Sequence, residues 1–394
     1  MTDQETSALA KQFNDSFAAF QAGNAEDDRV QALKAAQRLV AALEKPEDAA
    51  YKLAYSPTQA LAVRVGVDLE FFETLTRKDG PTTLEELAAP KGADPILAER
   101  FLRLLVGIGY VGESGKRVYV PTAMTKILTE RRIIAMTRFI FDYGMLSVAK
   151  LPEYLRLNNY KNPFSARGGP WQFAEKTDDT LWEFLSKTPI AMQECNTFLE
   201  GSRGSRTSWL EWFPVQERII DGFEGGDDAV LLVDVAGGRG HEIGAFKSKF
   251  PDAPGRLVLE DLAHVIDDVQ SLDPSIERVK IDLFEGQPVR AARNYYLKLI
   301  LHDWSDDDCR IILNNIKAAM KKGYSKLIVE DFILPDQDCS LLQSMWDCIM
   351  MLFLSSMERS ADQWTQLFES VGLKVTKFWY PPGEAQGIIE VEYS

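Results

Sequence analysis

Short apolar runs alternate with segments of helical period through the second half of the chain, and this alternation restricts the fold more than any other feature. The apolar runs are residues 229–235, 256–261, 278–284, 295–301 and 326–334. Buried strands separated by helices are typical of a mostly parallel sheet with helices on both faces. Residues 373–394 differ, because a short Pro/Gly loop joins two apolar runs there. We therefore predict an α/β fold whose sheet ends in an antiparallel hairpin.

The first half of the chain has a different rhythm. Residues 27–45 carry apolar side chains at steps of three and four, which indicates an amphipathic helix. Between residues 82 and 128, two short helices are followed by a hairpin, the order of a winged helix. Residues 200–209 and 221–229 are rich in glycine and small polar residues, as linkers and loops are. We predict a mostly helical, winged-helix domain over residues 1–205 and an α/β domain over residues 206–394.

A winged helix raises the possibility of DNA binding, but the charge of the chain argues against it. The net charge is −15 and the isoelectric point is near 4.9, whereas phosphate contacts need a basic face. The second helix of the unit, residues 95–111, is apolar on several faces and has Arg100 and Arg103 as its only basic groups. Packing within the chain or against a second copy is favoured, so we expect a homodimer and no nucleic-acid partner. An anionic membrane surface is disfavoured for the same reason.

The composition also places the chain in a broad class. No apolar run approaches the roughly 20 residues that cross a bilayer, and the first ten residues do not resemble a secretory signal. The four cysteines have no spacing typical of a zinc site; they are Cys195, Cys309, Cys339 and Cys348. Reduced thiols in a cytoplasmic protein without a structural metal are the simplest interpretation.

The first strand of the second half runs into a glycine loop, VDVAGGRGHEIGAF, residues 233–246. Glycines let the backbone approach a ligand closely, and ligands of parallel sheets bind beyond the carboxyl ends of the strands. Glu260 or Asp261, at the end of the next strand, is at a suitable spacing to accept hydrogen bonds from a ribose. The pattern favours an adenosine-containing cofactor over a mere tight turn, but it does not by itself exclude a nicotinamide.

Five motifs then narrow the choice: VDVAGGRGH, DLAHVI, IDLF, LKLILHDWSDDDC and VEDFILPD. Together they resemble the class I S-adenosylmethionine-dependent O-methyltransferases, especially the plant caffeate/flavonoid type and its fungal relatives in secondary metabolism. The resemblance covers residues from about 50 to the C-terminus. It implies a Rossmann-like catalytic domain with a seven-stranded sheet and an N-terminal dimerisation domain. It also implies metal-independent methylation of a hydroxyl on an aromatic or polyketide-like molecule, with S-adenosylhomocysteine as product.

The resemblance assigns roles to particular residues. The cofactor would be bound by Asp234, Gly237, Gly238, Gly240, Asp261, Leu262, Asp282, Leu283 and Lys298. His302 would be the general base, flanked by the carboxylates of Glu330 and Glu358. The acceptor would contact Asp303 together with apolar residues of two helical segments, namely Met192, Phe198, Trp346, Met350 and Phe353.

The chain departs from the family pattern at two places. Ala236 stands where a third glycine is usual, and Ser355, Ser356 and Met357 replace the glycines that usually precede Glu358. The second departure leaves open both the geometry of the loop at Glu358 and the shape of the pocket beside it. The acidic run Asp306–Asp308 fits a capping box that begins at Ser305, so we interpret it as a helix start and not as a metal site.

The expected chemistry explains why a histidine lies at a strand end. Methyl transfer needs an aligned and deprotonated oxygen, and an imidazole that titrates near 6.5 is largely available as a base near pH 7. A carboxylate on the other ring nitrogen would fix the tautomer. Alternatives remain: His302 could instead bond to the backbone at the strand end, and a cofactor-binding relative could catalyse a non-methylating rearrangement. A DNA-binding regulator and a nicotinamide oxidoreductase are less favoured.

Overall fold

The computed structural model describes residues 3–78, 80–165, 167–203, 207–383 and 385–394. The chain divides into two compact units. The first comprises Met1–Leu146 and Phe184–Arg206, and the second comprises Ser147–Glu183 and Thr207–Ser394. The domain boundary predicted at residues 205 and 206 lies outside the described residues. The division differs from the prediction at residues 147–183, because helix α10 (Pro170–Glu175) of this segment packs against helix α17 (Leu341–Leu354) of the C-terminal half.

The first unit is helical with one small sheet. Its three strands lie in the order β1-β3-β2. Its elements are α1 (Asp3–Gly23), α2 (Glu26–Leu43), α3 (Pro46–Tyr55), α4 (Pro57–Asp68), α5 (Phe71–Arg77), β1 (Thr82–Thr83), α6 (Leu84–Ala88), η1 (Ala89–Lys91), α7 (Pro95–Gly107), β2 (Val111–Gly115), β3 (Val118–Pro121), α8 (Ala123–Ile127) and α12 (Pro189–Arg203). Helices α9 (Arg131–Leu157) and α11 (Leu181–Lys187) contribute residues to both units. The two helices and the hairpin predicted between residues 82 and 128 are confirmed.

Local capping explains where several of these helices begin. Thr83 and Glu86 form a reciprocal capping box at the start of α6. Asp94 accepts a hydrogen bond from the backbone N–H of Ile96 at 2.7 Å, and Pro95 follows at the first helical position of α7. Pro57 opens α4 as predicted, but the side chain of Ser56 makes no capping hydrogen bond. These helices enclose a core of aromatic and aliphatic side chains.

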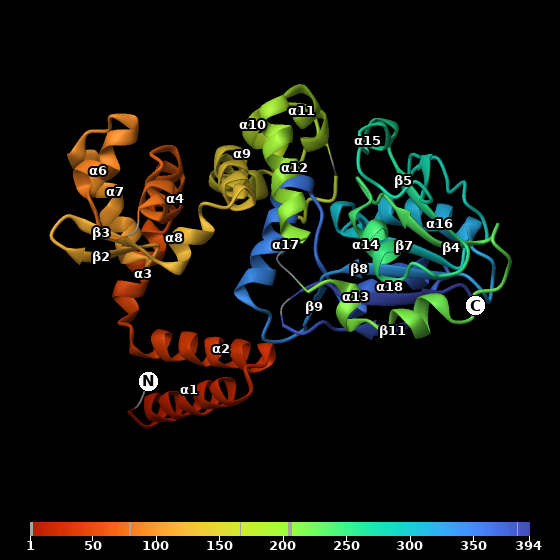
Figure 1. Cartoon of the computed structure of the whole chain (residues 1–394), viewed down its shortest axis with the longest axis horizontal. Helices are drawn as coiled ribbons and strands as arrows, with labels where there is room; N and C mark the ends of the chain where they lie inside the picture. The colour runs from red at the N-terminus through yellow and green to blue at the C-terminus, as the bar shows by residue number, and fades with distance from the viewer. Residues whose placement is uncertain (1–2, 79, 166, 204–206, 384) are drawn as a thin grey trace. The chain divides into compact units, whose positions relative to one another are not determined.

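The second unit contains a seven-stranded sheet in the order β11-β12-β8-β7-β4-β5-β6 (Figure 1). The strands are β4 (Val230–Val235), β5 (Arg256–Asp261), β6 (Glu277–Lys280), β7 (Asn294–Lys298), β8 (Lys326–Asp331), β11 (Lys374–Trp379) and β12 (Gly387–Glu392). Strands β4 to β8 are parallel to one another, and β11 and β12 form the antiparallel hairpin. The predicted α/β class, the mostly parallel sheet and the edge hairpin are confirmed.

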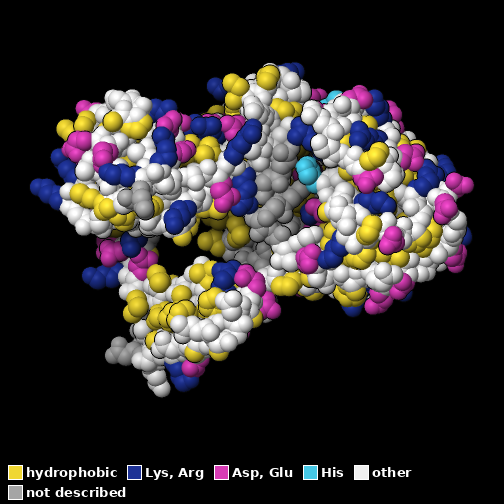
Figure 2. Space-filling model, in the orientation of Figure 1, with side chains coloured by type: hydrophobic (Ala, Val, Ile, Leu, Met, Phe, Trp, Pro, Cys, Tyr) yellow, Lys and Arg dark blue, Asp and Glu magenta, His cyan; other side chains and the backbone are white. Residues whose placement is uncertain are grey.

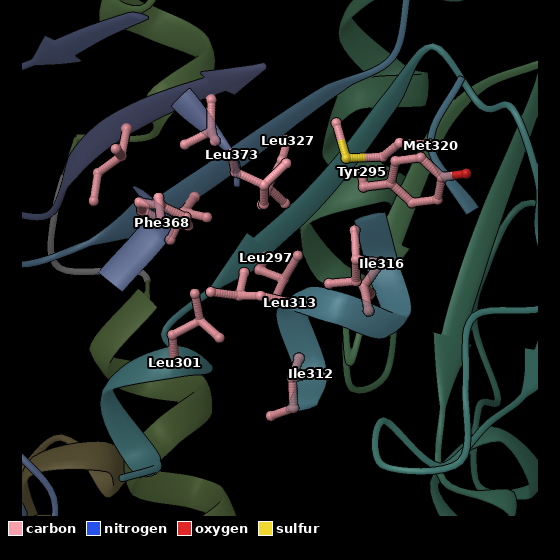
Figure 3. Close-up of a cluster of buried hydrophobic side chains, with 14 of the residues drawn as sticks. Tyr295, Leu297, Leu301, Ile312, Leu313, Ile316, Met320, Leu327, Phe368 and Leu373 are labelled. Carbon is pink, nitrogen blue, oxygen red and sulfur yellow. The ribbon is translucent and has the colours of Figure 1, made fainter. Parts of the chain in front are cut away.

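Helices cover both faces of this sheet because its central strands are apolar on both sides. On one face, side chains such as Tyr295 and Leu297 pack against α16 (Asp306–Ala319) and α18 (Ala361–Ser370), as Figure 3 shows. On the other face, Tyr296 and Ile328 pack against Trp209, Ile243 and their neighbours. The elements of that second layer are α13 (Trp209–Trp212), η2 (Gln216–Ile220), α14 (His241–Lys249) and α15 (Ala263–Asp267).

The remaining elements of the second unit are short or lie near one end of the sheet. They are α10 (Pro170–Glu175), η3 (Leu301–Asp303), β9 (Ile333–Leu334), α17 (Leu341–Leu354) and β10 (Arg359–Ser360). Strands β9 and β10 form a small parallel pair, which brings residues 359–360 back beside the end of β8. None of the helices within the described residues combines the length and the apolar character needed to cross a bilayer.

Candidate active site at the carboxyl edge of the sheet

The glycine loop and His302 lie at one edge of the sheet because they follow neighbouring parallel strands. Strand β4 pairs directly with β7; the glycine loop follows β4, and η3, which contains His302, follows β7. The carboxyl ends of parallel strands meet at the same edge, where ligands of such sheets bind. The predicted cofactor loop and the predicted base are therefore brought together by the topology.

The glycine loop has the backbone geometry of a close-fitting cradle. At Gly237 an added Cβ would come within 2.5 Å of the carboxylate of Asp234, which lies directly beneath it. Gly240 has a φ of +80°, and a Cβ there would meet Leu259 and Leu272 at 3.0 Å. Side chains at these two positions would distort the loop, so glycine is required by the structure. Ala236 adopts a φ of +56°, a conformation that glycine adopts with less strain.

The two acidic residues at the end of β5, Glu260 and Asp261, differ in their burial and in their hydrogen bonds. Asp261 accepts hydrogen bonds from the backbone N–H of Gly238 and of Leu262, each at 2.7 Å, one on each carboxylate oxygen. A carboxylate oxygen can accept more than one hydrogen bond, so these two backbone bonds are compatible with a ribose contact. Glu260 is fully buried and accepts a hydrogen bond from Gln287 instead, and burial raises its pKa to about 7. Asp261 therefore stays the predicted ribose residue.

The adenine side of the predicted cofactor site is partly open. Leu262 is 46% exposed next to Asp261. Asp282 is exposed and accepts a hydrogen bond from the backbone N–H of Phe284 at 2.9 Å. Leu283 packs partly against the core. Exposed apolar surface beside an anchored carboxylate fits an adenosine group, so the residues present are compatible with the predicted cofactor.

His302 is buried in the turn η3 and is surrounded by three carboxyl groups. Its Nδ1 lies 2.8 Å from Oε1 of Glu358 and 3.7 Å from Oδ1 of Asp331. Its Nε2 lies 3.3 Å from Oδ1 of Asp303. One oxygen of Asp331 and one of Glu358 are buried without a hydrogen-bond partner, so the cluster has unused acceptor capacity.

This environment changes the protonation expected for His302. Burial lowers the pKa of the ring, but the charges of Glu358, Asp331 and Asp303 outweigh that effect and raise it to about 10. Burial raises the pKa of Asp303 to about 6 and that of Asp331 to about 7, against the opposing effect of His302. With this pKa the ring is expected to be mostly protonated near pH 7, in contrast to the expectation of a largely neutral imidazole. The protonation of the ring therefore depends on that of Asp303 and Asp331.

Comparison with known proteins gives the family. An O-methyltransferase domain matches residues 212–374, and an O-methyltransferase dimerisation domain matches residues 53–131. The O-methyltransferase penC of Penicillium thymicola is 37% identical over 93% of this chain and 92% of its own length. The chain belongs to the O-methyltransferase family. The prediction that the chain is an S-adenosylmethionine-dependent O-methyltransferase is confirmed.

Solved structures agree with this assignment. The structure of LepI in complex with SAM has a TM-score of 0.89 and 26% identity, and the match covers all of both chains. A structure described as a pericyclic reaction enzyme has a TM-score of 0.88 and 26% identity, over 99% of this chain and all of that one. The likeness therefore covers residues of both units.

The side chain of Glu330 does not lie beside His302. The carboxyl group of the VEDFILP motif that lies near the ring is that of the next residue, Asp331. Side chains alternate across a strand. Glu330 points to the face of the sheet that Tyr296 shares, while Asp331 points to the face on which His302 lies. The prediction that Glu330 flanks His302 is therefore wrong. The flanking carboxylate is that of the next residue, Asp331.

Glu330 instead belongs to a buried charge network with Lys298. The Nζ of Lys298 lies 2.7 Å from Oε1 of Glu242 and 3.0 Å from Oε1 of Glu330. Tyr296 donates a hydrogen bond to Glu330, and the indole N–H of Trp209 donates to Glu242 at 3.2 Å. Burial lowers the pKa of Lys298, but the two carboxylates reverse the effect and raise it overall. The network ties the start of α14, after the glycine loop, to β7 and β8.

The loop before Glu358 forms without glycines. Ser355 ends α17 in the left-handed conformation, with φ 56° and ψ 35°, which glycine usually adopts. Asp347 on α17 accepts a hydrogen bond from the backbone N–H of Glu358 at 2.9 Å. Glu358 nevertheless reaches His302, so the departure from the family pattern is accommodated in the backbone.

The predicted acceptor residues fall in two places. Trp346, Met350 and Phe353 are on α17, which packs against the η3 turn that contains His302. Trp346 lies 5.7 Å from Phe332, measured between ring centroids. Met192 and Phe198 are on α12 of the first unit. The contacts of all of these residues with an acceptor stay a prediction.

Several residues of the site were not identified from the sequence. Asp331 is next to Glu330, which was identified. The alternation of side chains along a strand is the signal that could have distinguished the two residues. Glu242 and Asp347 lie on helices, and no sequence pattern indicates their partners. By distance alone, His302, Asp331 and Glu358 could hold a metal ion, since their ligand atoms lie within 4.8 Å of one another. We interpret them as an imidazole with its carboxylates, and metal independence stays a prediction.

Proposed function

We propose that the protein methylates a hydroxyl group of an aromatic or polyketide-like small molecule in secondary metabolism, and that the His302 cluster accepts the hydroxyl proton. The observation that supports this most directly is the position of His302. A buried imidazole with a carboxylate 2.8 Å from Nδ1 lies at the same sheet edge as the glycine loop. An imidazole held in this way by a carboxylate is the arrangement of a general base.

The glycine loop and the end of β5 bind the methyl donor in this proposal. Gly237, Gly238 and Gly240 would line its amino-acid part, and Asp261 would accept hydrogen bonds from its ribose. Asp282, Leu283 and Leu262 would surround its adenine. S-adenosylmethionine supplies an electrophilic methyl group when bound. The protein's part is to bind both reactants, to orient the hydroxyl oxygen and to remove its proton.

The proton acceptor is best described as a cluster of four groups. Nδ1 of His302 is oriented by Glu358, and Nε2 faces Asp303 at 3.3 Å. A hydroxyl that bonds to Nε2 or to Asp303 can pass its proton into the cluster. General-base assistance of this kind contributes about 10² to 10⁴-fold to a rate.

Helix α17 supports an apolar acceptor. It packs against the turn that contains His302, and its Trp346, Met350 and Phe353 are at least partly buried. An apolar wall with a few polar groups is typical of sites for small organic molecules. Asp303 is 22% exposed and supplies the polar contact closest to Nε2.

The test is a comparison of His302→Ala with the wild-type protein. The cofactor Kd, measured by calorimetry, is expected to stay within about threefold, while kcat for methyl transfer falls by about 10² to 10⁴. His264→Ala is the control, because His264 is an exposed residue of α15. Undiminished turnover in His302→Ala would exclude His302 from the mechanism.

A rearrangement without methylation is the second candidate, favoured by the likeness to the pericyclic reaction enzyme. Mass spectrometry of products separates the two functions. A product heavier by one methylene unit supports methylation, whereas an isomer of unchanged mass supports the rearrangement. The match to an O-methyltransferase domain and to curated O-methyltransferases favours methylation.

We also propose that the protein is a homodimer. The match to an O-methyltransferase dimerisation domain supports this. Figure 2 shows apolar side chains gathered on the hairpin of α1 and α2, and Leu33, Val40 and Leu43 of α2 are each at least 49% exposed. Apolar surface of this kind marks contact with another protein surface. Light scattering coupled to size-exclusion chromatography gives the mass in solution, and a monomer at micromolar concentration would contradict the proposal.

A further inference from the structure

Arg359, the residue after Glu358, is buried to 1% exposure although it carries a permanent charge. Its Nη1 donates to the carbonyl oxygen of Leu301 at 3.0 Å, and its Nη2 donates to that of Trp304 at 3.0 Å. Nε and Nη2 also donate to Oδ1 of Asp306, at 3.0 Å and 2.8 Å. A buried charge is strongly unfavourable unless it is paired and hydrogen-bonded, and here all three nitrogens have acceptors.

The two carbonyl groups that Arg359 contacts lie on either side of His302 and Asp303. Leu301 immediately precedes His302, and Trp304 immediately follows Asp303. Within the turn, the backbone N–H of Trp304 donates to the carbonyl oxygen of Leu301 at 3.3 Å. Arg359 therefore holds both ends of a four-residue segment whose two central side chains contain the proposed proton acceptors.

The guanidinium is itself fixed on two further sides. Asp306 is the first residue of α16, and the guanidinium carbon of Arg359 lies 5.0 Å from the ring centroid of Trp364 on α18. Stacking on an aromatic ring and several donors in one plane are properties of arginine that lysine lacks. A lysine ammonium cannot contact the two carbonyl oxygens and Asp306 with the same geometry.

Glu358 and Arg359 act on the same turn from successive positions of the chain, at the start of β10. The Glu358 carboxylate contacts the ring of His302, and the Arg359 guanidinium contacts the backbone on either side of it. Asp347 holds the backbone N–H of Glu358 at 2.9 Å. The ring and the turn are therefore positioned by a single short segment, residues 358–359.

We propose that Arg359 is a positioning residue for proton removal: it fixes the turn that presents His302 and Asp303, and Asp306 in turn fixes Arg359. The proposal rests on the proposed function of His302. A base that is displaced by even 1 Å loses much of its effect, since catalysis depends on alignment. Arg359 touches neither reactant in this proposal, so its loss changes the catalytic step more than it changes binding.

The first experiment compares Arg359→Lys with Arg310→Lys. Arg310 is the matched control, because it lies on α16, pairs with Asp307 at 2.6 Å and approaches Asp306 only to 3.9 Å, at the oxygen that Arg359 does not contact. In Arg359→Lys, kcat is expected to fall about 10- to 100-fold, while the acceptor KM and the cofactor Kd change by less than about threefold. A merely structural role would lower the melting temperature and weaken both affinities together with kcat. That result, or an unchanged kcat in the folded variant, would overturn the proposal.

The second experiment does not depend on methyl transfer. The chain has three histidines, so protein labelled with ¹⁵N-histidine gives few side-chain signals. We expect Arg359→Lys to shift the ring signals of His302 and to leave those of His241 and His264 in place. An unchanged His302 spectrum overturns the proposal. If the wild-type protein methylates no acceptor, the proposed function fails, and this spectrum still tests the role of Arg359.

Asp306→Asn covers the case in which Arg359→Lys does not fold. Asp306 is 45% exposed at the side chain, so its replacement leaves the core intact. Because Arg359 keeps its two carbonyl contacts, kcat is expected to fall by less than in Arg359→Lys, and the His302 signals are expected to shift by less. Wild-type kcat and wild-type His302 signals in Asp306→Asn would contradict the proposal.

Discussion

The protonation of His302 gives the sharpest prediction. The carboxyl groups that face the ring come from three places in the chain. Asp303 is in η3, Asp331 is in β8, and Glu358 immediately precedes β10. Together they raise the pKa of His302 to about 10 against the effect of burial. At pH 8 about one molecule in a hundred then contains a neutral ring, and at pH 7 about one in a thousand.

The measurement is a pH titration of ¹⁵N-histidine-labelled protein by nuclear magnetic resonance. The ring nitrogens of His302 are expected to keep the shifts of an imidazolium from pH 6 to about pH 9. Glu358→Gln keeps an oxygen acceptor near Nδ1 but removes the nearest charge, and it should lower the pKa of His302 by about one to three pH units. A titration midpoint near 6.5 in the wild-type protein would refute the electrostatic reasoning.

The same reasoning predicts the pH dependence of turnover. If the neutral ring is the base, kcat/KM rises about tenfold per pH unit up to pH 9. If Asp303, with a pKa of about 6, accepts the proton first, kcat/KM levels off above pH 7. An acceptor whose hydroxyl does not titrate below pH 10 is the control, because ionisation of the substrate would otherwise produce the same rise. A rate that falls between pH 7 and pH 9 would contradict both versions.

Three further predictions concern the cofactor site and the core. Ala236→Gly should raise the free energy of unfolding by roughly 0.5–1 kcal/mol, since glycine relieves the positive φ; a loss of stability in urea denaturation would contradict this. Asp261→Ala should weaken S-adenosylmethionine binding by about 1.5–3 kcal/mol, the value of a hydrogen bond to a charged group, and an unchanged Kd by calorimetry would remove Asp261 from the site. Leu313→Ala should cost about 2–5 kcal/mol in the same denaturation assay, because Leu313 is fully buried under the sheet; a cost below 1 kcal/mol would contradict it.

The elements of the catalytic unit were predictable because their signals are local. Residues 256–261 were predicted as a strand from a run of apolar side chains, and β5 has those bounds. Ser305 caps α16, as the spacing to Asp308 indicates. The run at residues 278–284 was less reliable, because β6 ends at Lys280. After Lys280 the chain leaves the sheet although it stays apolar, because Ile281, Leu283 and Phe284 pack against the core from outside the strand.

The contacts of the site were harder to predict because they join distant parts of the chain. The pKa of His302 depends on Asp331 and Glu358, which lie 29 and 56 residues further along the sequence. The partners of Arg359 are two backbone carbonyl groups, which no side-chain pattern reveals. The packing of residues 147–183 with the catalytic unit likewise depends on the surface of α17.

Two adjacent carboxylates show how the face of a strand decides a role that residue type leaves open. Glu330 is neutralised by Lys298 on one face of β8, and Asp331 adds to the negative charge around His302 on the other. Three carboxyl groups against one imidazolium leave the His302 cluster negative while its members are ionised. Such a cluster can take up a proton without building positive charge in a buried site, where an uncompensated cation is strongly unfavourable. The high pKa of the ring is therefore compatible with proton removal, provided that the ring and its carboxyl groups act together.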